Sequence, residues 1–320
     1  MIIVRFTSGL GNQMFQYNFY RLMQETYPQT TVAADTRWLY RNDPHLGYEL
    51  PVIFPKLREG SYAVKEASLA ECFKVSGQLQ GLSHSNSIEA KWARLSGGIN
   101  KRLRNGIMAE RFAANNIDDS TGLVTDELYN RVMNLDPGKD YYISSYWAYE
   151  MYYKDRLPLL QDELTMDEPC DEKNISMLNM IDGSNSVSIH IRRGDYLNPE
   201  NIDKFIALDN TYYSAAISYI KERVDNPKFF VFSDDIESAR KVLAGCENAV
   251  YVSHNTGADS FRDMQLMSRC KHNIIANSTF SQWGALLNRN EGHITIYPAA
   301  YMYGEDTEER TLPGWVRMTL

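Results

Sequence analysis

Short apolar runs alternate with amphipathic stretches along most of this chain, and the alternation predicts strands and helices in turn. The N-terminal pattern predicts a strand over residues 1–6, a tight polar turn over 8–13, a helix from 14 to about 26 and a strand over 30–34. The helix should end before Pro28, because proline cannot continue it. This β-loop-α-β opening is typical of α/β folds with a parallel sheet.

The second half of the chain repeats this rhythm more regularly. Strands are expected at residues 187–191, 228–232, 249–252, 273–276 and 294–297, and helices at 211–223, 235–244, 260–268 and 280–288. Strands joined by helices predict a parallel sheet covered by helices on both faces. Residues 165–186 are polar without a clear period, so we place a domain boundary there, between domains 1–165 and 166–320.

The middle of the chain is less regular. Residues 40–60 predict a proline-containing loop, and residues 62–115 are expected to be mostly helical or irregular. A strand is expected over 141–146, and a helix over 154–164 that Pro158 interrupts near its start.

Charge and composition narrow the function classes. The net charge is −8, and it is uneven: residues 1–165 hold 18 basic and 19 acidic residues, and the remainder holds 15 and 22. This balance lacks the broad basic face of a nucleic-acid-binding protein. The chain has no apolar run of bilayer length, and its first residues predict a strand instead of a secretory signal. Its four cysteines are scattered without a CxxC pair, which disfavours zinc sites and disulfide frameworks and favours the cytoplasm.

The most informative motif, His190-Ile191-Arg192-Arg193-Gly194-Asp195-Tyr196, lies at the end of the strand expected over 187–191. Two adjacent arginines at that place cannot both point into an apolar core. Their planar groups can hold a phosphate by paired hydrogen bonds, and ligands of open α/β folds bind at the carboxyl ends of the strands. Gly194 allows a sharp turn, Asp195 can orient an arginine and His190 can reach the same crevice. The alternative is a surface Arg–Asp ion pair beside a buried histidine.

Two further strand-end turns carry candidate chemistry. Gly9-Leu10-Gly11-Asn12-Gln13 could bring backbone N–H groups to an anion, and a tight turn that packs the helix on the sheet explains it equally well. In Phe232-Ser233-Asp234-Asp235, Asp235 is expected to cap the following helix. Asp234 is better placed to accept hydrogen bonds from guanine or ribose. The two carboxylates without a third partner make a poor magnesium site.

A third strand-to-helix turn is Asn277-Ser278-Thr279-Phe280-Ser281-Gln282-Trp283-Gly284. Hydroxyls and amides at a helix N-terminus form an anion site, although a plain cap would explain Ser278 or Thr279 alone. Because this turn follows a strand of the same predicted sheet as the arginines, we expect both at one crevice.

These four motifs, in their order along the chain, closely resemble those of the bacterial α-1,2-fucosyltransferases of glycosyltransferase family eleven, over residues 1 to about 300. The resemblance implies an α/β GT-B architecture of two Rossmann-like domains facing a central cleft. Residues 1–165 would be the acceptor-side domain and residues 166–320 the GDP-fucose-binding domain. It also implies a metal-independent, inverting transfer of L-fucose from GDP-β-L-fucose to the 2-hydroxyl of a galactose in a glycan acceptor, with no cofactor.

The resemblance also implies roles for individual residues. Arg192 and Arg193 would contact the pyrophosphate, Asp195 would orient them, and His190 would lie near guanine or ribose. Asp234 would read the guanine. The remaining donor contacts would come from Ser278, Thr279, Phe280 and Ser281, and from Gly11, Asn12 and Gln13 of the first domain. Trp38, Tyr146 and Trp147 could stack on sugars, although core packing is favoured for each.

The resemblance implies a single displacement, in which fixed cations and amides would stabilise the charge that develops on the departing GDP. No general base stands out. Asp195 is near the arginines, but an arginine-paired carboxylate is a weak base, and Glu200 is a more distant option that family members generally lack. Rival interpretations are a different linkage or nucleotide-sugar donor, or a nucleotide-binding module without catalysis. The missing GxGxxG excludes a dehydrogenase.

A basic segment has two interpretations. Its basic residues are Lys91, Arg94, Lys101, Arg102, Arg104 and Arg111. A solvated helix face is favoured. The alternative is peripheral contact with anionic lipid, or with a lipid-linked acceptor, at the inner face of the membrane.

Overall fold

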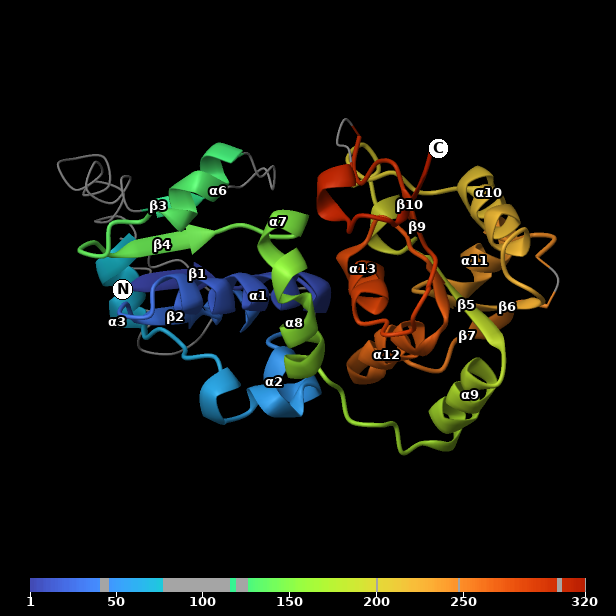
Figure 1. The fold of residues 1–320 in the computed structure, drawn as a ribbon, viewed down its shortest axis with the longest axis horizontal. Helices are drawn as coiled ribbons and strands as arrows, with labels where there is room; N and C mark the ends of the chain where they lie inside the picture. Colours follow the sequence, from blue (N-terminus) through green and yellow to red (C-terminus); the bar gives the residue numbers. More distant parts are fainter. Residues whose placement is uncertain are drawn as a thin grey trace. The chain divides into compact units, whose positions relative to one another are not determined.

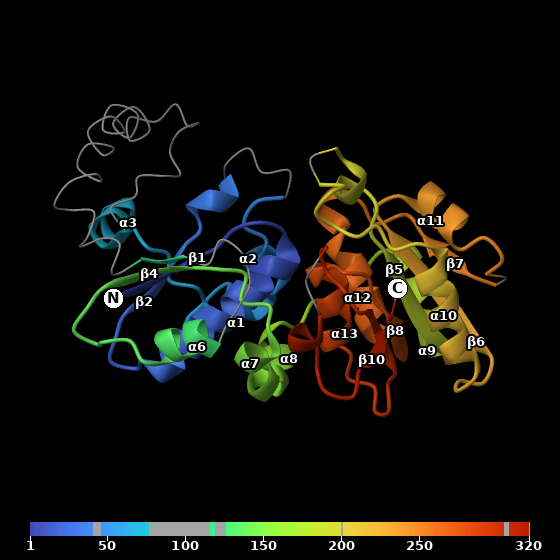
Figure 2. The ribbon, with the colours of Figure 1, turned by 90° about the horizontal axis from the view of Figure 1, so that it is seen from above.

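The computed structural model describes residues 1–40, 46–76, 116–118, 126–199, 201–246, 248–303 and 307–319 (Figures 1 and 2). The chain divides into two compact units, Met1–Thr165 and Met166–Leu320. Each unit is built around its own sheet, and every strand pairing in both sheets is parallel. Within the described parts of the chain, no helix is both long and apolar enough to cross a bilayer.

The first unit has a four-stranded sheet in the order β2-β1-β4-β3. Its strands are β1 (Ile2–Arg5), β2 (Val32–Asp35), β3 (Asn116–Asp118) and β4 (Tyr141–Ser144). Its α-helices are α1 (Leu10–Thr26), α2 (Leu50–Ile53), α3 (Leu69–Ser76), α6 (Asp126–Met133), α7 (Glu150–Tyr153) and α8 (Leu157–Glu163). The predicted β-loop-α-β opening is confirmed, with the helix beginning earlier than expected.

The first unit departs from the sequence prediction at one proline and confirms it at another. The loop expected over 40–60 contains α2, which has Pro51 in its first turn. The interruption that Pro158 predicts near the start of the helix over 154–164 is confirmed: a 3-10 turn, Lys154–Arg156, precedes α8, which has Pro158 in its first turn. Proline fits the first turn of a helix because the amide that it lacks would have no partner there.

The second unit has a six-stranded sheet in the order β10-β9-β8-β5-β6-β7, the strand order of a Rossmann fold. Its strands are β5 (Asn185–Ile191), β6 (Pro227–Ser233), β7 (Val250–Val252), β8 (His272–Ile274), β9 (Thr295–Pro298) and β10 (Val316–Met318). Its α-helices are α9 (Glu172–Asp182), α10 (Asn210–Lys221), α11 (Ile236–Val242), α12 (Phe261–Arg269) and α13 (Thr279–Leu286). Helices α10 and α11 cover one face of this sheet, and α12 and α13 cover the other (Figures 1 and 2).

Successive side chains of β5 point to opposite faces of the sheet. Val187, Ile189 and Ile191 are buried in the core that includes Tyr212 of α10. The intervening His190 faces the other way, and its ring centroid lies 5.9 Å from that of Phe280 in α13. The strand therefore sends a polar side chain towards the face that α13 covers.

Two elements of the second unit were missed by the sequence prediction. Helix α9 lies inside residues 165–186, which we expected to be irregular. Asp171 begins it, since its carboxylate accepts a hydrogen bond from the Asn174 amide. The edge strand β10 has only three residues, too few to give a period.

Asp263, in the first turn of α12, is a half-buried residue whose carboxyl group should make stability pH-dependent. Burial raises its pKa to about 7, although the hydrogen bond from Asn255 Nδ2 (2.8 Å) acts in the opposite direction. An aspartate in the unfolded chain titrates near pH 3.9. Between about pH 4 and 7 the unfolded chain therefore loses a proton that the native state keeps, so stability should fall as the pH rises.

Asp263→Asn should remove this dependence, because an amide oxygen still accepts from Asn255 and carries no proton to lose. We expect the variant to melt above the wild type at pH 8, with the difference shrinking towards pH 4. Calorimetric melts across this range test it. An equal difference between the two proteins at every pH would contradict it.

Candidate active site

The candidate site lies at the carboxyl ends of β5, β6 and β8. The chain runs from β5 to β6 and β7 on one side of the sheet, then crosses to β8 on the other side of β5. Open α/β sheets bind ligands at such a switch point. The arginine motif follows β5, Asp234 follows β6, and the turn that begins at Asn277 follows β8. The structure therefore brings the second-unit motifs to one edge of one sheet.

Asp234 holds in place the turn that contains Arg192, Arg193 and Gly194, which we call the arginine turn. Its Oδ2 pairs with Arg192 Nη1 at 2.8 Å, and its Oδ1 accepts the Arg193 amide at 2.9 Å. The two paired side chains are 28% (Arg192) and 25% (Asp234) exposed. We expected Asp195 to orient the arginines; the structure assigns a contact of that kind to Asp234, and the Asp195 side chain lies outside the described residues.

Gly194 is required by this close approach. A Cβ at this position would lie 2.6 Å from Asp234 Oδ2, closer than any normal contact. The same oxygen pairs with Arg192 and cannot withdraw without moving that arginine. Gly194 is therefore needed for the closeness of the turn to β6.

The two arginines differ in what they contact. Arg193 Nη2 donates to the Leu208 carbonyl at 2.8 Å, and its buried Nε has no partner among the described residues. The Arg192 side chain pairs with Asp234 and lies over the Tyr196 ring, with its guanidinium carbon 5.7 Å from the ring centroid. Arg193 thus supports the loop at residue 208, and Arg192 is the arginine that the strand end presents.

His190 is a buried, uncharged histidine. Burial, reinforced by the nearby Arg192 charge, lowers its pKa to about 3. Its Nδ1 is buried without a hydrogen-bond partner in the described structure. A neutral imidazole with an unsatisfied nitrogen can make one hydrogen bond to a polar ligand. The structure thus leaves His190 suited to the nucleoside contact that the sequence predicted, which stays a prediction.

Tyr196 joins the two strand-end turns and was given no role in the sequence prediction. Its hydroxyl donates to the Asn277 carbonyl at 2.7 Å, and its ring stacks on Phe205 with centroids 4.4 Å apart. Asn277 Nδ2 in turn donates to the Ile206 and Tyr301 carbonyls. These bonds fix the turn after β5 against the turn after β8. In the sequence, the only indication of a role for Tyr196 was its position inside the arginine motif.

The turn before α13 consists of buried and half-buried residues. Ser278 is the helix cap residue but makes no side-chain cap bond, and the Thr279 amide donates to the Tyr301 hydroxyl at 2.9 Å. Ser281 is fully buried, and its hydroxyl donates to the Ser278 carbonyl at 3.2 Å. Its predicted contact with phosphate or ribose would require that hydroxyl to leave a backbone partner.

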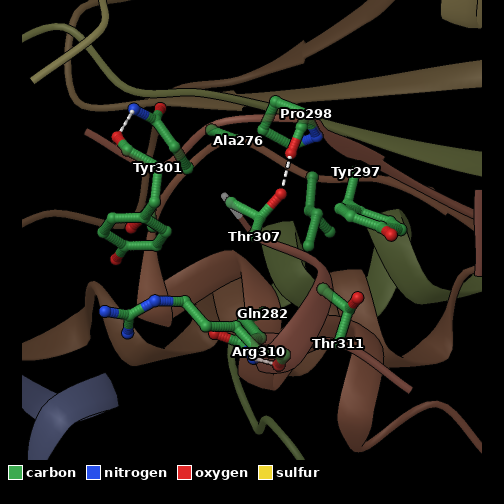
Figure 3. Close-up of a pocket in the computed structure, with 11 residues that line it drawn as sticks. Ala276, Gln282, Tyr297, Pro298, Tyr301, Thr307, Arg310 and Thr311 are labelled. Atoms are coloured by element: carbon green, nitrogen blue, oxygen red, sulfur yellow. Dashed lines mark hydrogen bonds between the residues drawn. The ribbon is translucent and has the colours of Figure 1, made fainter. Parts of the chain in front are cut away.

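A narrow pocket lies behind this turn (Figure 3). Gln282 Nε2 donates to the Arg310 carbonyl, Thr307 Oγ1 donates to the Pro298 carbonyl, and the Arg310 guanidinium lies 4.9 Å from the centroid of the Tyr301 ring. These side chains brace the turn through Tyr301. Arg310 and Tyr301 lie far beyond the turn in the sequence, so no local pattern could have indicated them.

The N-terminal motif is anchored within the first unit. Gln13 is fully buried, and its Nε2 donates to the Gly47 carbonyl at 2.8 Å while its Oε1 accepts the Glu49 amide at 3.0 Å. Asn12 Nδ2 donates to Ser8 Oγ, and Gly11 is buried. This packing supports the tight-turn interpretation for Gln13. A donor contact for Gly11, Asn12 or Gln13 stays a prediction.

Two capping and packing interpretations are confirmed. Asp235 caps α11, since its carboxylate accepts from both the amide and the hydroxyl of Ser238, which lowers its pKa. Trp147 is fully buried and stacks on Phe19 with centroids 3.6 Å apart. The basic residues of segment 91–111 and Glu200 lie outside the described residues.

Asp234→Asn should affect folding as well as ligand binding. An amide offers one acceptor where the carboxylate uses two, so its NH2 group must face either Arg192 or the Arg193 amide, both of which are donors. We expect weaker GDP binding. We also expect the free energy of unfolding to fall by about 1–3 kcal/mol, which lowers the melting temperature. Calorimetry and GDP titration on the same samples test this. An unchanged melting temperature would contradict the bracing role of Asp234.

Comparison with known proteins agrees with this geometry. The family model "Glycosyl transferase family 11" matches residues 95–319. The chain is 30% identical to an α-1,2-colitosyltransferase of Escherichia coli, over 99% of both chains. It is 28% identical to the O-antigen biosynthesis glycosyltransferase WbnK of E. coli, over 98% of both. It is also 26% identical to the mouse galactoside 2-α-L-fucosyltransferase Sec1, over 56% of this chain and 52% of that one.

Among solved structures, the fucosyltransferase NodZ from Bradyrhizobium matches with a TM-score of 0.53 at 15% identity, covering 89% of this chain and 91% of NodZ. This likeness shows the fold, and the predicted α/β GT-B class is confirmed. With a family model over most of the chain and near full-length relatives, the chain belongs to glycosyltransferase family 11.

Proposed function

We propose that this family-11 glycosyltransferase moves L-fucose from GDP-β-L-fucose to the 2-hydroxyl of a galactoside, as an inverting α-1,2-fucosyltransferase. The observation that carries the proposal is the arginine turn, held by Asp234, at the switch point of the second sheet. A diphosphate leaving group needs fixed positive charge, and this turn supplies it at the place where α/β sheets bind nucleotides. The names of the family relatives support the choice of sugar and linkage.

The reaction is a single displacement at the anomeric carbon. The acceptor 2-oxygen attacks from the face opposite GDP, the bond from carbon to the β-phosphate oxygen breaks, and its electron pair leaves with GDP. Arg192 stabilises the negative charge that grows on the β-phosphate, assisted by the turn that starts at Ser278. Because Asp234 already fixes Arg192, little reorganisation is needed as the charge develops.

The acceptor hydroxyl must lose its proton during the attack, and a carboxylate could accept it. Asp195 and Glu200 remain the candidates from the sequence. Asp234 is not a candidate, because its two oxygens already accept from Arg192 and from the Arg193 amide. His190 is neutral, but its place in the proposal is beside the nucleoside.

A second donor sugar has a specific observation in its favour. The relative that is 30% identical over nearly the whole chain is named a colitosyltransferase. Transfer of colitose would use the same arginine turn for its leaving group and would differ only in the sugar pocket. Donor competition decides between the two sugars.

The test is turnover of GDP-fucose and the corresponding colitose donor against a panel of β-galactosides, with the product linkage read by NMR. We expect an α-linked fucose on O2 of galactose, which is inversion from the β-linked donor. Transfer from colitose alone, a retained β-linkage or attachment at another hydroxyl would each contradict the proposal.

Transfer should also persist in excess EDTA. In the sequence, Asp234-Asp235 was the nearest pattern to a metal site, and in the structure Asp234 binds the arginine turn while Asp235 caps α11. Within the described residues, no group of three or more His, Cys, Asp and Glu side chains is arranged to hold a metal. In this proposal, Arg192 and the turn that starts at Ser278 stabilise the charge on GDP. Loss of turnover in EDTA that added magnesium or manganese restores would contradict this.

A further inference from the structure

Tyr301 contacts the first amide of α13 and comes from beyond a different strand. It lies on the segment that follows β9, and β9 is the neighbour of β8 in the sheet. Its hydroxyl accepts the Thr279 amide at 2.9 Å, and its backbone carbonyl accepts from Asn277 Nδ2 at 2.7 Å. Two hydrogen bonds therefore fix Tyr301 to the turn between β8 and α13.

The Thr279 amide lies at the positive end of a helix. Thr279 is the first residue of α13, and the first N–H groups of an α-helix have no acceptor within it. The cap residue Ser278 makes no side-chain cap bond, and the Tyr301 oxygen accepts this amide instead. A hydroxyl that accepts one hydrogen bond becomes a stronger donor, because linked hydrogen bonds polarise one another. A phenol at this place can thus donate a strengthened hydrogen bond to an anion.

The Tyr301 ring is held independently of its hydroxyl. The Arg310 guanidinium carbon lies 4.9 Å from the ring centroid, and Figure 3 shows both side chains at the same end of the pocket. Arg310 is 5% exposed, and its carbonyl accepts from Gln282 Nε2 of α13. Replacing the tyrosine by phenylalanine would keep this packing, so the hydroxyl can be removed alone.

A second observation points to a ligand beside this turn. His190 is 5% exposed, and its Nδ1 has no hydrogen-bond partner within the described part of the chain. Its ring centroid lies 5.9 Å from that of Phe280, the second residue of α13. A buried polar atom of this kind calls for a partner from outside the protein. The first turn of α13 therefore has a polar group waiting next to it as well as a polarised hydroxyl.

Tyr301 and Arg192 approach this place from opposite sides. Arg192 follows β5, Tyr301 follows β9, and β8 lies between these two strands. Contacts also connect the two sides: Arg192 lies over the Tyr196 ring, and the Tyr196 hydroxyl donates to the Asn277 carbonyl. The Asn277 side chain then donates to the Tyr301 carbonyl. An anion at the end of β8 would have the guanidinium on one side and the phenol on the other.

We propose that the Tyr301 hydroxyl, while it accepts the Thr279 amide, donates a hydrogen bond to a non-bridging oxygen of the β-phosphate of the sugar donor. Tyr301 is then a catalytic residue that stabilises the departing GDP from the β9 side, as Arg192 does from the β5 side. The hydrogen bond strengthens as negative charge grows on that phosphate, and no proton is transferred. The proposal rests on the proposed function, since it adds a donor to the leaving group of that reaction.

The test compares GDP with GMP, which lacks the β-phosphate, in Tyr301→Phe. The matched control is Tyr303→Phe, because Tyr303 lies on the same segment, is 64% exposed and is held by its backbone amide, which donates to the Lys204 carbonyl. The readouts are the Kd for GDP, the Kd for GMP, kcat for fucose transfer and the melting temperature.

We expect Tyr301→Phe to raise the Kd for GDP about tenfold and to leave the Kd for GMP unchanged. Its kcat should fall about 10²-fold, because the bond is strongest in the transition state. The melting temperature should stay close to the wild-type value, since Thr279 is half-buried and water can replace the phenol oxygen. Tyr303→Phe should match the wild type in every readout.

Three results would overturn the inference alone, in an enzyme that transfers fucose. Unchanged GDP affinity and kcat in Tyr301→Phe would show that the hydroxyl does not contact the donor. Equal weakening of GDP and GMP binding would make Tyr301 a brace of α13 only. Tighter GDP binding would show that the hydroxyl blocks the Thr279 amide. A wild type that transfers no fucose and binds GDP no more tightly than GMP would overturn the proposed function as well.

Discussion

Replacing Arg192 with alanine is expected to lower kcat for fucose transfer by about 10²–10³-fold, the usual effect of removing one fixed donor from a developing oxyanion. Arg192 is the arginine that β5 presents at its carboxyl end, 2.8 Å from Asp234. Charge on the β-phosphate grows as GDP departs, so the contact strengthens towards the transition state and kcat should fall more than substrate affinity. Lysine should rescue poorly, because it lacks the planar fork that can bind Asp234 and a phosphate together.

The other arginines provide the comparison. Arg193→Ala should lower the melting temperature as well as turnover, because its side chain holds the Leu208 carbonyl. Arg223→Ala is the matched control, since Arg223 is 43% exposed and pairs with its neighbour Glu222. Steady-state kinetics and thermal melts on the three variants test the assignment. Turnover near the wild-type level in both Arg192→Ala and Arg193→Ala would remove the arginine turn from the mechanism.

Gly194→Ala is expected to reduce transfer by about 10²-fold, because a displacement of about 1 Å in a catalytic group can cost that much. The added Cβ would lie 2.6 Å from Asp234 Oδ2, and that oxygen holds Arg192. The carboxylate must move, and Arg192 must follow it or lose its partner. GDP affinity should fall in parallel, because the diphosphate contact is built on the same turn.

The fold of the variant should survive, since Gly194 is exposed at the end of the strand. Gly138→Ala is a matched control, because its Cβ would also approach an aspartate oxygen, Asp136 Oδ1 at 3.2 Å, in a surface turn of the first unit. It should leave transfer unchanged. Full activity in Gly194→Ala would show that the close approach of Asp234 to this turn is unimportant for the reaction.

The sequence indicated the strand-end motifs because each follows a strand with a clear apolar pattern. It could not indicate their partners, since those depend on register. Parallel pairing places Ile191 opposite Ser233, so the next residues along, Arg192 and Asp234, become neighbours. We predicted that Asp195 orients the arginines because it is close to them along the chain, whereas Asp234 is close to them across the sheet. Local patterns do not contain that register.

The same limit applies to the N-terminal motif. Gln13 was a candidate for donor binding, and its amide is used to fix the backbone at Gly47 and Glu49, more than thirty residues away. Arg5 was not singled out, because one arginine at the end of an apolar strand has no distinctive pattern. Its contacts with Trp38 and Ser144 appear only in the folded structure.

The central claim is that the arginine turn at the switch point of the second sheet binds the diphosphate of a guanine nucleotide. The most direct test is calorimetric titration of GDP and UDP into the wild-type protein and into Arg192→Ala. The account predicts that GDP binds the wild type, that UDP binds more weakly, and that Arg192→Ala weakens GDP binding by about tenfold or more, as loss of a charge-assisted contact should. A wild type that binds neither nucleotide, or an Arg192→Ala variant that binds GDP as tightly as the wild type, would contradict it.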